Sequence, residues 1–364
     1  MKIVVDCRYT KVDQHDGISR FGARIAESLG RIADVTMLVS DERQLAMLPD
    51  LPWSMTSDPT SPRELFVAKQ VNKLRPDVVF SPMQTMGSWG REYGLVLTLH
   101  DLIYYRHRTP PRELPQWLRL LWRLYHLAWW PQRLLLNRAD AVATISQTTQ
   151  SLIEEHHLTR RPIAVIGNAA DDPLDAAPRS APAAGAPAEL VYMGSFMPYK
   201  NVETLARALD LLPGATLHLC SKITPSMLAS LEALAPPGSI VAHNGVTDEE
   251  YHALLRRATA LVSASRDEGF GIPLVEAMAL GTPVVVSDIP IFREIGGEAA
   301  RYASPDLPAD FAGAISALSA PKTWAHASQA SRDQADVFDW NRSAAKLLTV
   351  LERVVEQRGG PRAT

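Results

Sequence analysis

Short apolar runs alternate with longer amphipathic segments along most of the chain, and this alternation restricts the fold more than any other feature. In the first half, the apolar runs expected to form strands are residues 2–5, 35–39, 77–80, 95–99, 141–145 and 163–166. Between them, segments such as 17–29 and 62–74 have apolar residues at helical spacing. Strands that alternate with helices form βαβ units with right-handed crossovers, so the pattern predicts a parallel sheet covered by helices.

The same alternation starts again after residues 169–189, which are rich in alanine and proline and lack periodicity, as interdomain linkers do. The expected strands of the second half are 190–193, 216–219, 240–242, 260–263 and 283–287, and the expected helices include 202–212, 248–257 and 274–280. We therefore predict an α/β protein with two doubly wound, Rossmann-like domains. Their expected bounds are 1–168 and 190–340, followed by a C-terminal helix and tail at 341–364 that could return to the first domain.

Composition excludes several other classes of protein. The length of 364 residues suits two domains at roughly 150 residues each. With 37 basic and 40 acidic residues the net charge is −3, which provides no global field for holding nucleic acid. Two distant cysteines, Cys7 and Cys220, cannot form a disulfide framework or a CxxC zinc motif. The chain begins with a strand pattern instead of a signal peptide and has no long apolar span, so we expect a cytoplasmic protein.

The most informative stretch is 265–286, with the sequence SRDEGFGIPLVEAMALGTPVVV. A strand is expected to end just before it, and a glycine-rich loop carries Glu268. A helix is expected to begin around Pro273, with Glu276 on its first turn. Ligands of parallel sheets bind at the carboxyl ends of strands, and Gly269 and Gly271 let a loop backbone approach a ligand closely. The N–H groups at a helix start also suit phosphate. The alternative is a helix-capping acid followed by an ordinary surface helix.

Residues 268–285, EGFGIPLVEAMALGTPVV, resemble the glutamate–seven–glutamate signature of retaining glycosyltransferases of the GT-B fold, classed as glycosyltransferase group 1 or family 4. Other motifs of this family are resembled by DGISRF (16–21), LTLHDLIY (97–104), RADAVATISQTT (138–149), MGSFMPYKN (193–201) and HNGVTDEEYHALLRRATALVSAS (243–265). The resemblance covers most of the chain. It implies that the two Rossmann-like domains face each other across a cleft, with the donor bound mainly by the C-terminal one.

The resemblance also implies roles for individual residues. Glu276 matches the glutamate that binds the ribose hydroxyls of a nucleoside-diphosphate sugar, and Glu268 matches the one that contacts the donor sugar. Lys200 matches the lysine that stabilises the departing diphosphate, a task that a fixed cation performs without a metal. His100 matches a histidine that contacts the donor sugar from the N-terminal domain, although a lone histidine after a strand is often an ordinary loop residue. Ser195 departs from the family, because many relatives have arginine there.

His100, Glu268 and Lys200 are therefore the expected catalytic residues. Further expected donor-binding positions are Gly17, Ile18, Gly194, Ser195, Asn244, Val246, Gly269, Phe270, Gly271 and Ile272, together with Glu276. Asp6 and Arg8 flank the end of the first expected strand, where they form either an internal ion pair or part of the site. No HxxxH, DxD or Cys/His cluster indicates a metal, and no cofactor is expected because the nucleotide sugar is a substrate.

A second feature is the segment 104–138, which has seven arginines and one acidic residue. Aromatic and basic side chains on one helical segment suit an anionic membrane surface. The candidate interface residues are Trp117, Arg119, Trp122, Arg123, Trp129 and Trp130. The alternative is a buried helix whose arginines reach its rim.

Together these features predict a metal-independent retaining glycosyltransferase that moves a sugar to a glycan or lipid-linked acceptor. A GDP-mannose-like donor is favoured, with a UDP-sugar as the other candidate. The alternatives are another GT-B enzyme (a nucleotide-sugar epimerase or a phosphorylase) and a non-catalytic subunit that binds nucleotide sugars. The expected location is the cytoplasm, with peripheral contact to the inner membrane face, and no nucleic acid partner is expected.

Overall fold

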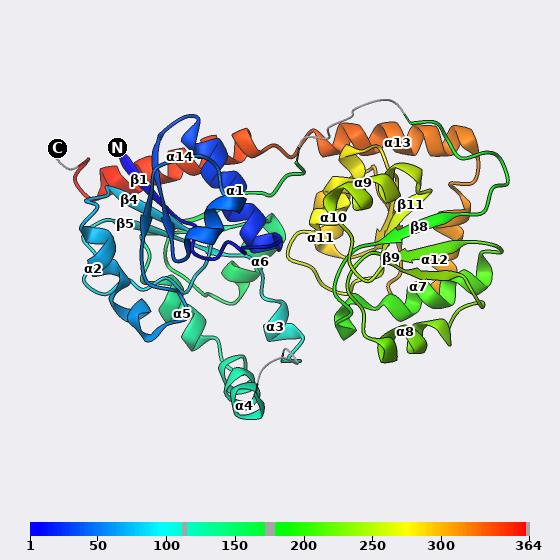
Figure 1. The fold of residues 1–364 in the computed structure, drawn as a ribbon, viewed down its shortest axis with the longest axis horizontal. Coiled ribbons are helices and arrows are strands. Elements are labelled where there is room, and N and C mark those ends of the chain that lie inside the picture. Colours follow the sequence, from blue (N-terminus) through cyan, green and yellow to red (C-terminus); the bar gives the residue numbers. More distant parts are fainter. Residues whose placement is uncertain (111–114, 172–178, 362–364) are drawn as a thin grey trace. The chain divides into compact units, whose positions relative to one another are not determined.

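The computed structural model describes residues 1–110, 115–171 and 179–361. The chain forms two compact units, one comprising Met1–Asn168 with Asp339–Thr364, and the other Ala169–Phe338 (Figure 1). Each unit is a parallel β-sheet with helices on its faces, the α/β class that the alternating sequence pattern predicts. No helix among the described residues has the length and apolar character needed to cross a bilayer.

The first unit is built on a seven-stranded parallel sheet with the order β3-β2-β1-β4-β5-β6-β7. Its strands are β1 (Lys2–Asp6), β2 (Asp34–Val39), β3 (Trp53–Met55), β4 (Val78–Ser81), β5 (Gly94–Leu99), β6 (Ala141–Thr144) and β7 (Ile163–Val165). Its helices are α1 (Gly17–Gly30), α2 (Val67–Asn72), α3 (Ile103–Arg106), α4 (Gln116–Tyr125), α5 (Trp130–Leu136), α6 (Gln147–Glu155) and α14 (Trp340–Gln357), with 3₁₀ turns η1 (Glu42–Met47) and η2 (Pro62–Phe66). β3 is not among the expected strands because this short, partly exposed edge strand has no apolar run.

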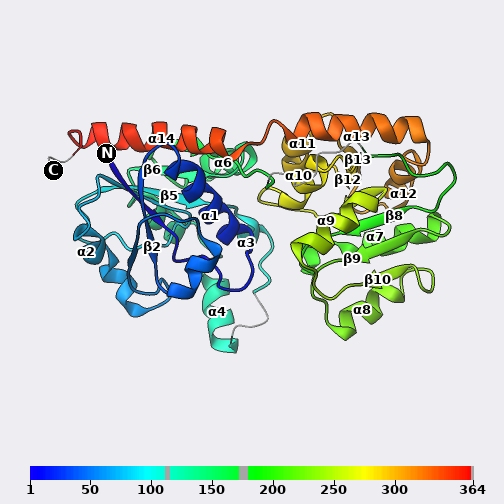
Figure 2. The same cartoon turned by 45° about the horizontal axis from the view of Figure 1, so that its top comes forward.

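The last helix, α14, belongs to the first unit and lies along α1 and β5 (Figure 2). The ring of Trp340 contacts that of Phe21 on α1, with 6.1 Å between centroids, and the Ser343 hydroxyl donates to the Gly167 carbonyl at 2.8 Å. Asp339 caps α14 by accepting from the Arg342 N–H. The second unit therefore ends at Phe338, slightly before the expected boundary at 340, because the chain already packs on the first unit at Trp340.

The second unit is built on a six-stranded parallel sheet with the order β10-β9-β8-β11-β12-β13. Its strands are β8 (Glu189–Tyr192), β9 (Thr216–Leu219), β10 (Ile240–Ala242), β11 (Ala260–Ser263), β12 (Val284–Ser287) and β13 (Arg301–Ala303). Its helices are α7 (Val202–Ala208), α8 (Pro225–Glu232), α9 (Asp248–Arg257), α10 (Ile272–Ala279), α11 (Pro290–Gly296), α12 (Pro308–Ser316) and α13 (Pro321–Ala335), with 3₁₀ turns η3 (Pro198–Lys200) and η4 (Leu209–Leu211).

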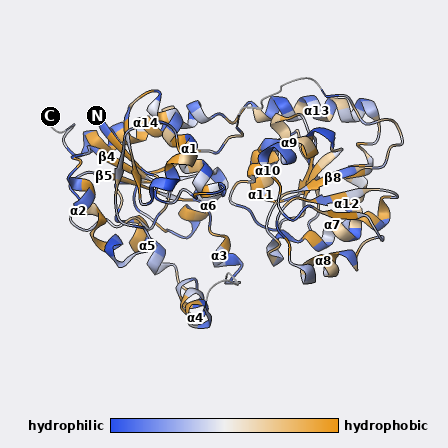
Figure 3. Cartoon of the chain, in the orientation of Figure 1, coloured by the Kyte–Doolittle hydropathy of each residue, from blue (hydrophilic) through white to orange (hydrophobic). Residues whose placement is uncertain are grey.

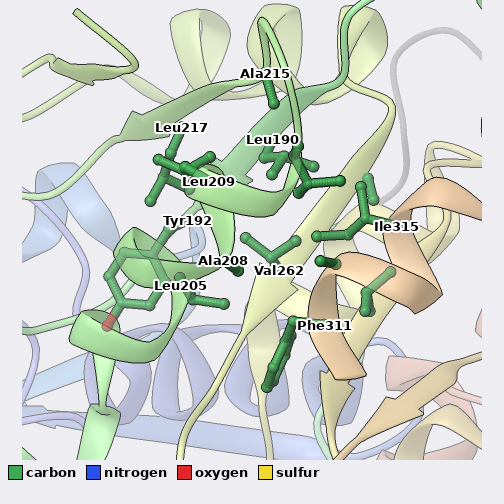
Figure 4. Packing of buried hydrophobic residues seen from close by; sticks show 14 of the residues in the cluster. Leu190, Tyr192, Leu205, Ala208, Leu209, Ala215, Leu217, Val262, Phe311 and Ile315 are labelled. Carbon is green, nitrogen blue, oxygen red and sulfur yellow. The ribbon is translucent and has the colours of Figure 1, made fainter. Parts of the chain in front are cut away.

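One face of this second sheet is covered by α7 and α12, whose apolar side chains form a continuous core with those of the strands (Figure 4). Leu205 and Phe311 are among the helix residues that contact it, and Val262 projects from β11. The inner strands β8, β9, β11 and β12 are buried almost throughout, so their sequences are nearly continuous apolar runs and can be recognised as strands. The edge strand β13 is partly exposed, has no apolar run, and is not among the expected strands.

Part of the expected linker is fixed to the second unit. Arg179 lies over the ring of Trp324 at 4.9 Å and donates to the Ala258 carbonyl at 3.0 Å and to the Thr282 hydroxyl at 2.7 Å. At Arg179 the expected linker is therefore packed on the second unit. Residues 172–178 of the expected linker lie outside the described residues.

Candidate functional site

The second sheet reverses its strand order at β8, which pairs with β9 on one side and β11 on the other. Loops that follow two such neighbouring strands leave the sheet in opposite directions, and ligands of open parallel sheets bind at that point. The loop after β8 leads to Lys200, and the loop after β11 carries Glu268. The structure therefore brings the two charged residues singled out by the sequence to one place.

Lys200 and Glu268 form a short, mostly buried ion pair. The Nζ atom of Lys200 lies 2.6 Å from Oε1 of Glu268, and each side chain is 14% exposed. The Ser265 hydroxyl donates to the same Oε1 at 2.8 Å. The Arg266 N–H donates to the Tyr199 carbonyl at 2.8 Å, which joins the two loops through their backbones as well. A fixed positive charge and a fixed carboxylate thus lie side by side at the reversal point.

Asn201 holds this arrangement together, and the sequence interpretation gave it no separate role. It has a left-handed backbone with φ of 53°, and it separates η3 from α7. Its buried side-chain amide donates to the Ala264 carbonyl at 3.2 Å and to the Pro305 carbonyl at 2.6 Å. Asparagine tolerates left-handed geometry better than most residues, so the Lys–Asn pair in the motif was the available signal.

The second glutamate, Glu276, is the fifth residue of α10, since the helix begins at Ile272, one residue before the expected start at Pro273. It therefore follows the first turn instead of lying on it, and it is 8% exposed. Proline is accepted within the first turn of a helix and does not mark a single position. Gly271 precedes α10 with φ of 95°, and a Cβ there would lie 3.1 Å from the Phe292 ring. This glycine is therefore required by the backbone turn itself.

The other expected donor-binding residues of the second unit lie in the loops after β8, β10 and β11 and at the start of α10. Gly269 is buried, and Phe270 is buried with its ring 5.6 Å from that of Phe338, so its side chain serves the core. Ile272 is half-buried. In the loop after β8, the Gly194 N–H donates to the Ser221 hydroxyl at 3.1 Å, and the exposed Ser195 accepts from the Tyr192 hydroxyl through its carbonyl at 2.7 Å.

After β10, Asn244 has a left-handed backbone, and its side-chain oxygen accepts from the Ile223 N–H at 3.1 Å. Val246, in the same loop, is partly exposed. This contact links the loop after β10 to the loop after β9, whose Ser221 in turn contacts Gly194. The loops after β10, β9 and β8 therefore form a connected series along the carboxyl edge of the sheet.

In the first unit, His100 follows β5 and lies against α1. Its ring contacts Phe21 edge-on with 5.2 Å between centroids, and Gly17 and Ile18 form the first turn of the same helix. The Nε2 atom lies 2.7 Å from the Pro82 carbonyl, which can only accept, so Nε2 carries the proton. Desolvation of the ring lowers the pKa of His100 to about 4. At neutral pH the ring is uncharged, and its Nδ1 is left as a hydrogen-bond acceptor.

The Asp6 and Arg8 side chains form a buried ion pair, with Nε of Arg8 2.7 Å from Oδ1 of Asp6. Arg8 also pairs with Glu64, at 2.6 Å between Nη1 and Oε2, and the Ser81 hydroxyl donates to Asp6 at 3.1 Å. Of the two interpretations from the sequence, the internal ion pair is the one that the structure shows.

The tryptophans of the arginine-rich segment have different environments. The ring of Trp122 contacts those of Tyr104 and His126, and the ring of Trp129 stacks on Tyr105 with 4.1 Å between centroids. Both side chains are half-buried, Trp122 beside Tyr104 and His126, and Trp129 against the apolar core of the first unit. Trp130 is exposed, as is Arg123 on α4, where Arg119 is half-buried. The side chain of Trp117 lies outside the described residues.

Comparison with known proteins supplies the family. Residues 17–172 match the family model described as Glycosyltransferase Family 4, and residues 187–320 match the model described as Glycosyl transferases group 1. The chain belongs to the group 1 glycosyltransferases of family 4. The first match includes His100, and the second includes both Lys200 and Glu268.

Several relatives of this glycosyltransferase are mannosyltransferases by name. It is 54% identical to the O-antigen chain mannosyltransferase RfbU of Salmonella typhimurium over 61 residues, which cover 17% of each chain. It is 29% identical to the MMP alpha-(1->4)-mannosyltransferase of Mycolicibacterium hassiacum over 174 residues, covering 44% of this chain and 41% of that protein. Each alignment spans less than half the length of the relative.

The fold of this glycosyltransferase is the GT-B fold. Sucrose-phosphate synthase from Thermosynechococcus elongatus superposes with a TM-score of 0.74 over 98% of this chain and 99% of that chain, at 18% identity. At this identity the similarity concerns the fold alone. Among the described residues no group of three or more histidine, cysteine or acidic side chains is arranged to hold a metal ion.

Proposed function

We propose that this protein is a retaining glycosyltransferase that moves a hexose from a nucleoside-diphosphate sugar to a glycan or lipid-linked acceptor. The observation that carries the proposal is the Lys200–Glu268 ion pair at the strand-order reversal of the second sheet. Departure of a nucleoside diphosphate builds negative charge on the phosphates, and a preorganised cation stabilises this charge. A neighbouring carboxylate accepts hydrogen bonds from the hydroxyls of the donor sugar.

In this proposal the chain's own residues perform the steps without a bound metal. Lys200 stabilises the leaving diphosphate, Glu268 orients the sugar ring, and Glu276 accepts from the two ribose hydroxyls. The anomeric configuration of the sugar is proposed to be retained, as the resemblance to the glutamate signature implies. The bond between the anomeric carbon and the phosphate oxygen breaks, the acceptor oxygen bonds to that carbon, and the donor's phosphate oxygen takes the acceptor proton. His100 contributes a neutral ring whose Nδ1 accepts a hydrogen bond from a sugar hydroxyl, because its lowered pKa of about 4 keeps the ring uncharged at pH 7.

The proposed donor is GDP-mannose or a close analogue, because relatives that align with this chain are named as mannosyltransferases. A positive charge at the diphosphate does not distinguish one nucleotide base from another, so UDP-sugars belong in the same assay. The proposed acceptor is a glycan or a lipid-linked sugar. We also propose that the enzyme makes a peripheral contact with an anionic membrane at the cytoplasmic face.

The test is release of free nucleoside diphosphate from a panel of donors by the purified protein, with and without EDTA. We expect GDP release from GDP-mannose that an acceptor accelerates and EDTA leaves unchanged, and a product with the α configuration of the donor by NMR. Glu268→Ala should abolish transfer while nucleotide binding persists, and Glu276→Ala should weaken nucleotide binding. Absence of both turnover and nucleotide binding across the panel would reject the proposal, whereas binding without turnover would favour a non-catalytic subunit.

A further inference from the structure

Helix α4 has an apolar face that no described part of the protein covers. Leu120, Leu121, Leu124 and the following Leu127 are each more than half exposed to solvent. Residues three and four apart share one side of a helix, so these leucines form a single stripe. Figures 1 and 2 both show α4 standing out from the body of the first unit, away from its sheet. Isolated exposed leucines are ordinary, but four of them on a projecting helix and the residues just after it are not.

The apolar surface continues onto α5. Trp130 and Leu134, four positions apart at the start of this helix, are both more than half exposed, whereas Gln132 and Leu136 on its other side are buried. The inner face of the segment is anchored by stacked rings, with Trp129 between Tyr105 and His156 at centroid distances of 4.1 and 4.2 Å. The outer face is thus held in place by the protein while its own apolar side chains remain unpacked.

Positive charge accompanies this apolar surface. Residues 115–139 contain four arginines and no acidic residue, in a protein whose net charge is −3. Arg119 and Arg123, one turn apart, line a depression on α4 together with Gln116 and Leu120. Among the described residues neither arginine has a carboxylate partner. Figure 3 shows hydrophobic and hydrophilic residues side by side on α4.

We propose that the outer face of α4 and the start of α5 dock this enzyme on an anionic lipid bilayer. In this arrangement Leu120, Leu121, Leu124, Leu127, Trp130 and Leu134 enter the boundary between headgroups and acyl chains, and the arginines contact lipid phosphates. Charge complementarity selects this occupant. A second copy of the same face would bring arginines against arginines, and it would supply no acid to pair with them. The docking residues therefore differ from the sequence expectation, since the half-buried rings of Trp122 and Trp129 contact neighbouring rings and are not among the most exposed side chains.

The experiment is flotation of the full-length protein with vesicles of neutral phosphatidylcholine and with vesicles containing phosphatidylglycerol. We expect binding to the anionic vesicles that falls with added salt. Arg119→Glu with Arg123→Glu should weaken it at least about tenfold, since each basic residue near such a surface contributes about 1 kcal/mol. Leu120→Ser with Leu124→Ser should weaken it by a similar factor through lost apolar burial.

Matched controls separate this surface from general charge and hydrophobicity. Lys322→Glu with Lys346→Glu makes the same change in net charge at exposed sites elsewhere, and Leu211→Ser with Leu307→Ser removes two equally exposed leucines. Both controls should bind anionic vesicles as the wild type does. Equal binding to neutral and anionic vesicles, no binding to either, or equal loss in the controls would overturn the proposal. So would dimerisation that the α4 variants abolish in the absence of lipid.

The inference rests on the proposed function in placing the acceptor at a membrane, but vesicle binding is measured without donor or acceptor. If the protein binds anionic vesicles and has no transferase activity, the docking surface stands and the proposed function fails. If the α4 variants turn over a soluble acceptor normally and the wild type does not bind vesicles, the reverse holds. Circular dichroism of each variant shows whether its fold is retained.

Discussion

At Lys200, the ion pair with Glu268 determines where positive charge is held in the ligand-free protein. The two residues come from loops after β8 and β11, and the buried amide of Asn201 ties these loops to each other and to Pro305. A lysine is flexible and strongly hydrated, so its position depends on what surrounds it. Here a carboxylate at 2.6 Å supplies that restraint.

Replacing Lys200 with alanine should therefore lower kcat by about 100-fold or more, the usual cost of removing one preorganised donor to a developing negative charge. The measurement is steady-state turnover of the donor, with nucleotide affinity measured separately by calorimetry. Ser265→Ala is the matched control, because it removes the hydroxyl that donates to Glu268 Oε1 and leaves the cation. Turnover of Lys200→Ala within about twofold of wild type would contradict the assigned role.

His100 provides a prediction about pH. The pKa of this residue is about 4 in the folded protein, below its usual value of about 6.5. Between these values the unfolded chain binds a proton that the folded protein does not, so protonation favours unfolding. The contribution of His100 to stability is therefore complete above pH 6.5 and declines as pH falls towards 4.

The measurement is urea unfolding of wild type and His100→Gln at several pH values from 7.5 to 4. Glutamine keeps a donor for the Pro82 carbonyl and does not titrate in this range. Relative to the variant, the wild type should lose stability as the pH is lowered through this interval. A constant difference between the two proteins would show that the ring is not held neutral by its surroundings.

Helices and strands whose sequences carry capping motifs or apolar periodicity can be predicted from the sequence. The bounds expected for α9, 248–257, agree with the structure, because Thr247 and Glu250 form a capping box and two arginines end the helix. The start of α10 is one residue off, since Pro273 is compatible with more than one position in a first turn. Elements without apolar periodicity, such as β3 and β13, give no such signal.

The candidate site shows the same division. The sequence motif places Glu268, Glu276 and Lys200 in the correct loops or helix, because each follows a recognisable strand. The contact between Lys200 and Glu268 depends on β8 and β11 being neighbours, which is a long-range pairing that local pattern does not encode. The partial burial of Trp129 likewise depends on long-range contacts with Tyr105 and His156, which composition does not encode.

Asn201 connects two elements of the site, because it ends η3 and precedes α7. Asn201→Ala removes three side-chain hydrogen bonds, two donated to carbonyls and one accepted from the Thr204 hydroxyl, together with a residue that tolerates left-handed geometry. It should destabilise the second unit by about 2 kcal/mol or more. Donor affinity should fall with it, since Lys200 loses its neighbouring support. Asn201→Gly is the control, because it restores the backbone freedom without the hydrogen bonds. If both variants bound nucleotide with wild-type affinity, the support would not reach Lys200.

At the scale of the whole molecule, each unit has its own sheet and its own buried core, and the chain crosses between them twice. The second crossing returns α14 to the first unit, where Leu347, Leu351, Val354 and Val355 are buried. A Cβ on Gly94 of β5 would lie 2.6 Å from Val354, so the helix packs closely on the strand. The first unit is therefore assembled from both ends of the sequence.

This arrangement predicts two thermal transitions in calorimetry that respond to different changes. GDP at about 100 times its dissociation constant should stabilise only the second unit, by about 2.7 kcal/mol.

Truncation after Phe338 should abolish the transition of the first unit. Each lost leucine or valine accounts for roughly 1.5–3 kcal/mol of burial, against a total stability of about 5–15 kcal/mol for a typical domain. The second transition and its response to GDP should survive the truncation. A truncated chain with both transitions intact would show that α14 is not part of the first unit's core, and a GDP shift of the first transition would place the nucleotide there instead.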